Sequence, residues 1–475
     1  MSRHLAFLVA LLLGAVLRCL VQVGFSPALI FGDAAAYLSF LDTFEPIADR
    51  PMGYSLLVLY PLSWLSDTLL LVTVAHHLMG LATATVVYLL LRRWDVRGWV
   101  ATLATLPVLF DSLQLLLEQS VLSDVFFTLL LVLGMAALGW RRRPTPALAL
   151  AAGLLFAAAV TVRLVGQPLV LAGVAFCLLA GRGWHARLST AAALTVGFVL
   201  PLAGYATWYH QVHGVYALSE FGGKSLYIRT TSFVDCSQVS VPQYQRVLCP
   251  PEPVGERLDP TVYGWHDDRT VPRLRPPRGT TPNEAMGEFA GAAIGAQPAD
   301  YARVVVRDFI LNFDPWRTDR FEFARAYKWQ FDTYVDYGLS EEARDVYNRH
   351  GGDLLESRAP YADFIAGYQR IGYLTGPLLL GCLLLGLAGG LGIGRARSSG
   401  ARSMCLLLTL TGAGLLLLPD ITAQFSWRYQ LPALSLLPAG AALAFTALRD
   451  GRGGQVAALD PADADIGTVA TPRTD

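Results

Sequence analysis

Three arginines lie inside or at the edge of strongly apolar segments, at Arg18, Arg163 and Arg428. A charge at the centre of a membrane helix costs roughly 2.5 to 3.5 kcal/mol, so each position calls for a partner or a function. A guanidinium binds phosphate through planar, paired hydrogen bonds, so the three arginines predict an anionic headgroup such as a lipid phosphate. The alternative is that each side chain extends to water or pairs with a nearby acid.

Acidic residues recur close to these arginines. Asp33 follows the first apolar segment, and Glu118 and Asp124 flank the start of a later one. A carboxylate beside a reacting hydroxyl can accept its proton, which contributes roughly 10²- to 10⁴-fold to a rate. The alternative is that these acids cap helices, and it weighs most for Asp124, which follows Ser123.

The composition points to the bilayer as the solvent. Of the 475 residues, 53% are hydrophobic and 16% are charged, which is too apolar for a soluble protein of this length. The formal net charge is zero, so nothing predicts a nucleic-acid partner, which would require clustered basic surface. We therefore expect an all-α polytopic membrane protein.

Crossing a bilayer as a helix takes roughly 17 to 25 apolar residues. The segment 146–181 is interrupted by Arg163, Gln167 and Pro168, which marks either a kink or a turn between two short helices. Two helices are favoured. With that choice the sequence predicts ten spans, at 5–24, 68–91, 98–113, 121–139, 146–163, 166–181, 189–208, 367–391, 403–419 and 429–448.

Arginine placement orients these spans, because short cytoplasmic loops collect Lys and Arg. One side has most of the basic residues, whereas the short loops opposite contain only Arg50, Arg163 and Arg428. The arginines of the richer side are Arg3, Arg92, Arg93, Arg97, Arg141 to Arg143, Arg182, Arg187, Arg395, Arg397, Arg402, Arg449 and Arg452.

This pattern predicts a multi-pass protein of the cell membrane with both termini in the cytoplasm. The segments predicted outside are 25–67, 111–120, 209–366 and 419–428. The first apolar run is expected to stay as a helix rather than to be cleaved as a signal peptide. The predicted parts are an N-terminal membrane module at 1–208, a domain at 209–366, C-terminal helices at 367–449 and a disordered tail at 450–475.

The insertion at 209–366 predicts one extracytoplasmic α+β domain between the seventh and eighth spans. Its first part, Ser225 to Phe233, is rich in aromatic and β-branched residues and predicts strand. Thr281 to Glu284 has the pattern of a capping box, so a helix is expected to begin at Pro282. A second helix is expected from Pro298 to about Phe313.

Cysteine and histidine have mainly structural interpretations. An external location allows Cys236 and Cys249 to form a disulfide, worth roughly 3 kcal/mol in the chain-entropy model. Two free thiols are the alternative. His76 and His77 are adjacent and point in different directions on a helix, so packing or hydrogen bonding is favoured over metal ligation.

Four separated stretches resemble the GT-C superfamily of membrane glycosyltransferases, in particular the protein-mannosyltransferase-like group that uses lipid-linked sugars. The first two resemble the group's acid-plus-tyrosine and Arg-Pro-x-Gly-Tyr segments. The third stands where the group has a Ser-Glu pair, and the fourth is like its Arg-Tyr-x-x-Pro. In chain order the stretches are Gly32-Asp33-Ala34-Ala35-Ala36-Tyr37, Arg50-Pro51-Met52-Gly53-Tyr54, Gln119-Ser120-Val121-Leu122-Ser123-Asp124 and Trp427-Arg428-Tyr429-Gln430-Leu431-Pro432.

The resemblance implies a glycosyltransferase that moves a sugar from a polyprenyl-phosphate donor to an external acceptor, with inversion at the anomeric carbon. It implies that Asp33 is the catalytic base and that Arg428 contacts the carrier phosphate, where Arg163 and Arg18 are further candidates. Side chains expected to line the substrate are Tyr37, Arg50, Tyr54 and Tyr429.

Two departures from the group leave roles open. Many relatives have a second acid directly after the first-loop aspartate, where this chain has Ala34, and Asp124 replaces the commoner Glu. Whether Asp124 or Glu118 orients the acceptor or holds a divalent cation is therefore undecided by the sequence. So are the transferred sugar and the acceptor, which is a glycan, a protein or a lipid.

Two other functions compete with transfer. A transporter or flippase of lipid-linked glycans would show two related halves and broken helices near the midplane. Here the charged residues instead gather at one surface, and a single large domain interrupts the spans. A non-catalytic assembly partner with the same fold would tolerate Asp33→Asn, whereas an enzyme would not.

Overall fold

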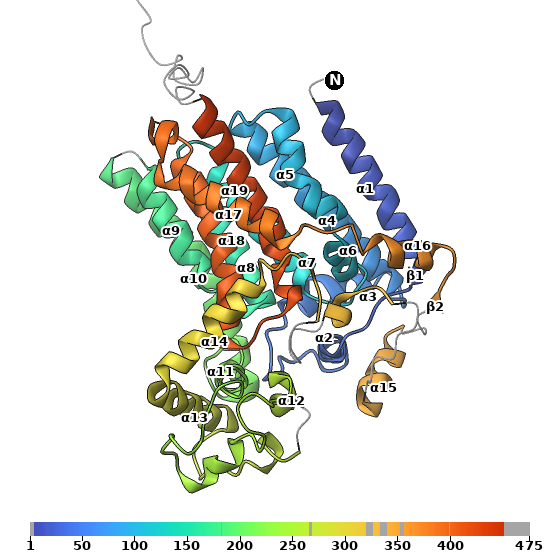
Figure 1. Cartoon of the computed structure of the whole chain (residues 1–475), viewed down its shortest axis with the longest axis vertical. Coiled ribbons are helices and arrows are strands. Elements are labelled where there is room, and N and C mark those ends of the chain that lie inside the picture. Colours follow the sequence, from blue (N-terminus) through green and yellow to red (C-terminus); the bar gives the residue numbers. More distant parts are fainter. Residues whose placement is uncertain are drawn as a thin grey trace, which may run out of the picture.

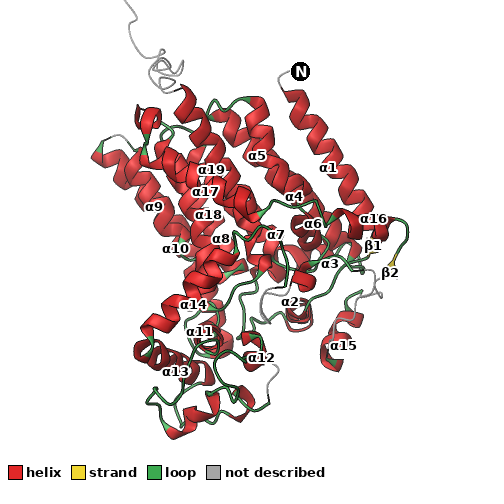
Figure 2. Cartoon of the chain, viewed as in Figure 1, coloured by secondary structure: helices red, strands yellow, loops and turns green. Residues whose placement is uncertain are grey.

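The computed structural model describes residues 4–181, 183–265, 268–319, 326–332, 340–351, 356–398 and 400–450. Helices make up most of this part of the chain (Figure 2). The predicted tail lies outside the described residues from position 451 on, and so do Arg3, Arg182 and Arg452.

A bundle of apolar helices forms the body of the protein (Figure 1). Within the described residues, five helical segments are long and apolar enough to cross a membrane: α1 (Leu5–Gly24), α4 (Leu70–Arg93), α10 (Trp184–His213), α18 (Arg402–Thr422) and the segment Trp427–Arg449, which comprises η8 (Trp427–Gln430) and most of α19 (Leu431–Asp450). Four shorter apolar segments are α7 (Asp124–Gly139), α8 (Pro146–Val162), Leu164–Ala180 with η3 (Leu164–Gly166) and α9 (Leu169–Ala180), and α17 (Gly376–Leu391). The protein is thus an all-helical polytopic membrane protein.

The span predicted at 98–113 is a bent pair of helices. α5 (Gly98–Phe110) and α6 (Ser112–Glu118) meet at an angle of 53°. Asp111 ends the first helix and caps the second, because its side chain accepts a hydrogen bond from the Leu113 N–H. All seven residues of α6 are buried. The segment 111–120, predicted to lie outside, is therefore for the most part a buried helix rather than an open loop, since Asp111 restarts a helix that turns into the bundle.

The break expected within 146–181 is confirmed. α8 ends at Val162, and Arg163 has an extended backbone with φ −149° and ψ 124°. Pro168 lacks the N–H that would continue a helix from the preceding turn. α9 then begins at Leu169.

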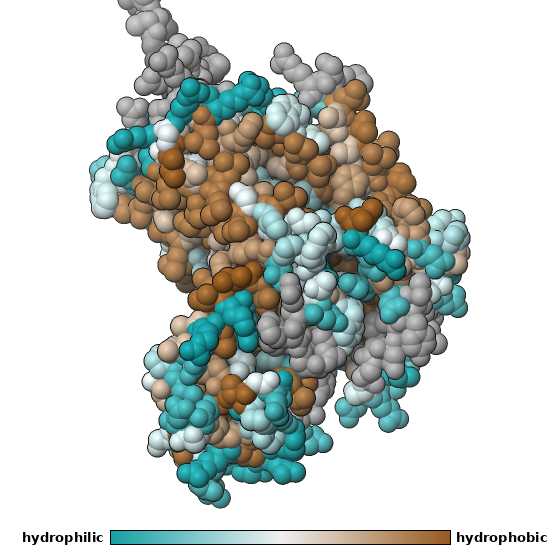
Figure 3. Space-filling model, viewed as in Figure 1, coloured by the Kyte–Doolittle hydropathy of each residue, from teal (hydrophilic) through white to brown (hydrophobic). Residues whose placement is uncertain are grey.

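The two ends of the bundle differ in character. The start of α1 and the end of α19 lie at one end, and α11 to α13 lie at the other (Figure 1). We call the first the arginine end, because it contains Arg92, Arg93, Arg141 to Arg143, Arg187, Arg395, Arg397 and Arg402. Arg142 forms an ion pair there with Asp95. A hydrophobic belt separates the two polar ends in the space-filling view (Figure 3).

The opposite end has a small lobe with its own apolar core. It contains α11 (Gly222–Thr230), α12 (Pro260–Trp265), α13 (Pro282–Ala296) and the short turns η4 (Gln243–Leu248) and η5 (Val271–Arg273). α14 (Pro298–Leu311) leads from this lobe back to the bundle. The core residues are Tyr227, Val234, Leu248, Tyr263, Leu274, Ala285, Met286, Phe289 and Ala293.

The prediction of strand at Ser225 to Phe233 is wrong, because most of this segment belongs to helix α11. A local preference for strand over nine residues is a weak force, and packing overrides it. α11 crosses α13 very closely at Gly223, where an added Cβ would lie 1.9 Å from the carbonyl oxygen of Asn283. The described residues of the lobe are helical and irregular, so the lobe is not α+β.

Helix α13 begins as predicted. Thr281 and Glu284 form a complete capping box, and Pro282 occupies the first turn. The following helix, expected from Pro298 to about Phe313, ends two residues earlier at Leu311.

The rest of the insertion returns to the bundle. α15 (Glu341–Arg349) packs against α2 (Gly32–Thr43), and α16 (Tyr361–Tyr368) packs against α1. The strands of the described chain are β1 (Phe25–Ser26) and β2 (Glu356–Ser357), which pair antiparallel. Short helical pieces complete this end and the loop after α17: η2 (Ser55–Leu59), α3 (Tyr60–Ser63), η6 (Ala326–Trp329) and η7 (Gly394–Ser398).

Candidate active site

Five charged side chains are linked in a row at the lobe end of the bundle, in the order Arg50, Asp33, Arg428, Asp124 and Arg163. Asp33 accepts from Nη1 of Arg50 and from Nη1 of Arg428, both at 2.6 Å. Arg428 also donates to Oδ2 of Asp124 from Nε at 2.9 Å and from Nη2 at 2.6 Å. Arg163 completes the row with a 2.7 Å contact to the other oxygen of Asp124. We call these five residues the charge row.

The row is assembled from segments that are far apart in sequence. Asp33 lies in the first turn of α2, Asp124 begins α7, and Arg163 follows α8. Arg428 lies in η8, the turn that opens the last membrane segment. Each of these positions is at the lobe end because the helices run alternately between the two ends. Neither acid caps its helix with its side chain, so the capping alternative does not describe them.

The members of the row differ in exposure. The side chain of Asp33 is 32% exposed, whereas those of Arg428 and Asp124 are 9% and 6% exposed. Asp33 is therefore the carboxylate that a ligand can reach, and Asp124 is the buried carboxylate that pairs with both Arg428 and Arg163. With three arginines and two aspartates, the row has a formal charge of +1, which suits an anionic ligand.

The environment of Asp33 keeps it ionised. Burial raises the pKa of this carboxyl group, but the charges of Arg50 and Arg428 and their hydrogen bonds outweigh that effect. The net result is a pKa well below the usual range. Burial lowers the pKa of Arg50, and the neighbouring Asp33 charge more than compensates, so the pKa of Arg50 is raised.

Aromatic side chains surround the row. Tyr37 lies under the Arg50 guanidinium at 5.6 Å, and its hydroxyl is 2.9 Å from Oγ of Ser123. The ring of Tyr429 likewise lies 5.6 Å from the guanidinium carbon of Arg163. Tyr54 is fully buried and packs edge-on against Tyr37 at 5.1 Å between ring centroids. The tyrosines predicted to line the substrate are thus near the row, although Tyr54 has no exposed surface.

Arg18 and Glu118 are not part of this arrangement. They form a separate buried pair, with 2.7 Å between Nη2 and Oε1 and side chains 3% and 0% exposed. Arg18 also donates to the backbone carbonyls of Gly14, Val108 and Leu109. All these contacts lie between α1, α4 and the bend from α5 to α6. Grouping Arg18 and Glu118 with Asp33 is therefore wrong in geometry, because the bend carries Glu118 into the bundle.

The two adjacent histidines are held by hydrogen bonds. His77 contacts Oε2 of Glu118 at 2.8 Å and Oε1 of Gln119 at 2.9 Å. His76 contacts the Tyr54 hydroxyl at 3.1 Å. Each ring points to a different partner, as expected for neighbours on a helix.

The residues present do not fit a bound divalent cation at the row. All four carboxylate oxygens of Asp33 and Asp124 accept from guanidiniums. Among the described residues, no three His, Cys, Asp or Glu side chains are grouped so that they could hold a metal ion.

One buried ion pair and two hydrogen bonds to backbone carbonyls connect the lobe, through α14 and the end of α18, to the turn that holds Arg428. Arg229 of α11 contacts Asp308 of α14 at 2.5 Å, and both side chains are fully buried. Arg229 also donates to the carbonyl of Asp420 at the end of α18. Gln430, two residues after Arg428, donates to the carbonyl of Asn312 at 3.0 Å. The lobe thereby helps to fix the position of η8.

The predicted pairing of Cys236 with Cys249 is present as a disulfide in the lobe. It joins the segment after α11 to the end of η4, next to the apolar core. Cys19, Cys177, Cys382 and Cys405 are free thiols in the membrane helices.

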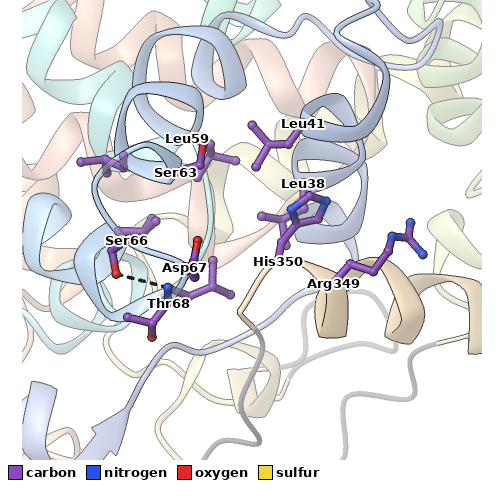
Figure 4. A pocket seen from close by; sticks show the side chains of 12 residues that line it. Leu38, Leu41, Leu59, Ser63, Ser66, Asp67, Thr68, Arg349 and His350 are labelled. Carbon is purple, nitrogen blue, oxygen red and sulfur yellow. Dashed lines mark hydrogen bonds between the residues drawn. The ribbon is translucent and has the colours of Figure 1, made fainter.

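Two cavities lie near the row. One of about 150 Å³ lies between α2, the η2 to α4 region and α15, and Figure 4 shows His350 turned toward Leu38 while Arg349 points outward. Both residues pair with Asp42 at 2.9 Å. Ligand pockets have volumes of about 300 to 1,000 Å³, so this cavity is small for a substrate. The other cavity, of about 620 Å³, is large enough.

The larger cavity shares aromatic walls with the row. It is lined by Trp329 and Trp427, among others. The Trp329 ring lies 5.6 Å from the Arg428 guanidinium carbon, and it stacks on Phe31 at 5.0 Å between centroids. Sequence reasoning missed both tryptophans as site residues. The available signal was that Trp427 directly precedes Arg428.

Comparisons with known proteins add little. No protein-family model matches the chain, and no curated protein matches its sequence. Its fold is similar to part of the protein O-mannosyltransferase Pmt1-Pmt2 complex of S. cerevisiae, solved bound to the sugar donor, with 14% identity and a TM-score of 0.33. The match covers 54% of this chain and 38% of that chain. Similarity at this level leaves the function to be argued from the residues themselves.

Proposed function

We propose that the protein is a membrane glycosyltransferase of the GT-C type, which transfers a sugar from a polyprenyl-phosphate donor to an acceptor hydroxyl. The observation that carries the proposal is the charge row. It combines an accessible carboxylate with two guanidiniums that share a buried acid, at one end of a membrane bundle. An acid and an anion site side by side are what transfer from a phosphate carrier requires.

In this mechanism the donor phosphate binds to Arg428 and Arg163. Asp124 anchors both guanidiniums, so they can turn toward a phosphate without losing their position. Phosphate oxygens then take the place of Asp33 on Arg428. Because the chain of guanidiniums is already assembled, little reorganisation is needed when charge develops on the leaving group.

Asp33 acts as the general base. The acceptor oxygen attacks the anomeric carbon while the carbon–oxygen bond to phosphate breaks, and the bonding electron pair leaves with the phosphate. The acceptor proton passes to the Asp33 carboxylate. Attack from the face opposite to the leaving group inverts the anomeric carbon. Once Arg428 contacts the phosphate, Asp33 loses one partner, and its pKa rises toward that of a useful base.

The placement of the arginines supports an orientation in the membrane. Short loops rich in arginine lie at the end opposite to the row, and such loops face the cytoplasm. Asp33 and the lobe then lie on the extracytoplasmic side of the cell membrane, and both termini lie inside.

The direct test supplies the purified protein in lipid nanodiscs with a panel of polyprenyl-phosphate sugars and measures release of polyprenyl phosphate. Asp33→Asn is expected to lower turnover by about 10²- to 10⁴-fold. Asp42→Asn is the matched control, since Asp42 lies on the same helix, is 33% exposed and is also paired with cationic partners. If the wild type turns over no donor, the enzyme function is refuted and a flippase or a scaffold remains. If Asp33→Asn turns over donor as fast as the wild type, the assignment of Asp33 as the general base is refuted.

A further inference from the structure

The cavity of about 620 Å³ lies beside the charge row but includes none of its five residues. Its volume falls in the range of about 300 to 1,000 Å³ that small-molecule sites occupy. The donor sugar has to lie between the phosphate and Asp33, which is the row itself. The lining residues therefore belong to a separate subsite: Ser112, Trp316, Arg317, Thr318, Ala326, Tyr327, Trp329, Gln330, Phe331, Asp332, Ala366, Gln369, Arg370, Tyr373 and Trp427.

Aromatic rings dominate the walls of this cavity. Trp316 and Tyr327 are 63% and 53% exposed, so their ring faces are accessible to a ligand. Trp329 and Tyr373 contribute two more rings. A flat aromatic face suits a sugar, because the C–H faces of a pyranose are apolar and its hydroxyls point outward from the rim. Several rings around one cavity provide such faces for more than one sugar unit.

Two buried hydrogen-bond donors in the cavity wall have no partner among the described residues. One is the indole Nε1 of Trp427, a residue only 2% exposed, and the other is Nε of Arg317. A buried donor without a partner costs about 1 to 3 kcal/mol. Both nitrogens lie behind the accessible surface of the cavity, so a carbohydrate hydroxyl accepts from them only after a small shift of the wall.

The polar side chains of the cavity are held in place before a ligand arrives. Arg317 donates to both oxygens of Asp111, at 2.9 and 3.1 Å, and lies over the Tyr373 ring at 5.1 Å. Gln369 is bonded through its amide to the backbone of Phe331 at 2.6 and 2.7 Å. Rigid polar groups between aromatic faces favour a polyhydroxylated ligand, which can make further hydrogen bonds to them, over a lipid chain, which cannot.

We propose that this cavity binds a neutral carbohydrate, namely the sugar units of a glycan acceptor that adjoin the hydroxyl to be glycosylated. Its role as an acceptor site rests on the proposed function, whereas carbohydrate binding by the cavity does not. Trp329 connects the two sites, because one ring lines the cavity and contacts both Phe31 and Arg428. A glycan held in the cavity is thus separated by one ring from Arg428, which pairs with the Asp33 carboxylate proposed to deprotonate the acceptor.

The test measures direct binding to the full chain in nanodiscs by saturation-transfer NMR. The probes are mannotriose, galactotriose and arabinotriose, with a Ser/Thr-rich peptide as the competing acceptor class. At least one trisaccharide is expected to bind. Trp316→Ala should weaken that binding by about tenfold. Trp427→Phe removes the indole N–H together with part of a ring that is only 2% exposed, so it should weaken binding and also lower the melting temperature, whereas Trp316→Ala should leave the melting temperature unchanged.

The matched control is Trp184→Ala, because Trp184 is 66% exposed at the arginine end, far from the cavity along the bundle. It should bind as the wild type does. The proposal is overturned if no trisaccharide binds, if binding survives both Trp316→Ala and Trp427→Phe, if only the peptide binds, or if polyprenyl phosphate displaces the trisaccharide. Trisaccharide binding by a protein that turns over no donor would refute the proposed transfer and still support the carbohydrate site.

Discussion

Nη1 of Arg428 lies 2.6 Å from Oδ2 of Asp33, although 395 positions separate the two residues in the chain. The contact joins the first helix after α1 to the turn that opens the last membrane segment. Arg428 reaches Asp124 with two other nitrogens at the same time. A guanidinium shared by an exposed and a buried carboxylate can exchange the exposed partner for a phosphate while the buried partner holds it.

The first prediction concerns the dependence of activity on pH. The pKa of Asp33 is depressed, so Asp33 is ionised in the free protein at every pH above its ordinary value of about 3.9. The profile of kcat/KM reports groups of the free enzyme, so the wild type should show no titration of Asp33 between about pH 5 and pH 8. Arg50→Gln removes one of the two lowering charges while burial still raises the pKa. An acidic limb should therefore appear in that variant and shift toward neutral pH.

Arg50→Lys is the control for this experiment, since it keeps the charge and should keep the flat profile. Identical profiles for the wild type and Arg50→Gln would contradict the assigned cause of the depressed pKa. The lowered pKa of Asp33 also predicts how the stability of the fold depends on pH. A carboxylate with a lowered pKa stabilises the fold above its unfolded value, and that contribution is lost as the pH falls through the folded pKa.

The second prediction separates the buried pair from the row. Arg18→Met leaves the Glu118 charge buried without its main partner, which costs about 3 to 5 kcal/mol in comparable pairs. We expect a clear loss of thermal stability with an unchanged KM for the donor. Arg163→Gln, at a side chain 18% exposed, should raise the donor KM with little effect on melting. A raised donor KM in Arg18→Met, together with a loss of thermal stability in Arg163→Gln, would instead support Arg18 as the arginine that binds the phosphate.

The third prediction concerns the lobe. Cys236 and Cys249 close a loop with a separation of 13 residues, which the chain-entropy model values at about 3 kcal/mol. Cys249→Ser should make the lobe more sensitive to limited proteolysis, and a reductant should do the same to the wild type. Cys382→Ser changes a free thiol of α17 and should have no such effect. Equal protease resistance with and without the disulfide would contradict a stabilising role.

The sequence was sufficient to predict the apolar helices of the bundle, although the helix expected from 367 begins at Gly376, and to single out Asp33 and Arg428. Charges are rare in apolar segments, so those at the ends of the spans stand out. Alternation of the spans then brought the two residues to the same end of the bundle. Asp124 and Arg163 were found in the same way, and the structure adds that they complete one connected row.

Other features depended on geometry that the sequence does not encode locally. Glu118 was grouped with Asp33 because the 53° bend between α5 and α6, which buries it, has no clear local signal. The strand expected at Ser225 to Phe233 became helix α11 through its close contact with α13. Trp329 acquires its place only through packing against Phe31 and Arg428. Each case depends on contacts between segments distant in sequence.

The most direct test of the central claim is the affinity for a polyprenyl phosphate that has no sugar, measured in nanodiscs for three proteins. Arg428→Gln should bind about tenfold more weakly than the wild type, because a charged, paired hydrogen-bond donor to the phosphate is lost. Asp33→Asn should bind at least as tightly as the wild type, because the carboxylate that competes with phosphate for Arg428 is neutralised. Unchanged affinity in Arg428→Gln, or an equal loss in both variants, would contradict the exchange of Asp33 for phosphate on Arg428.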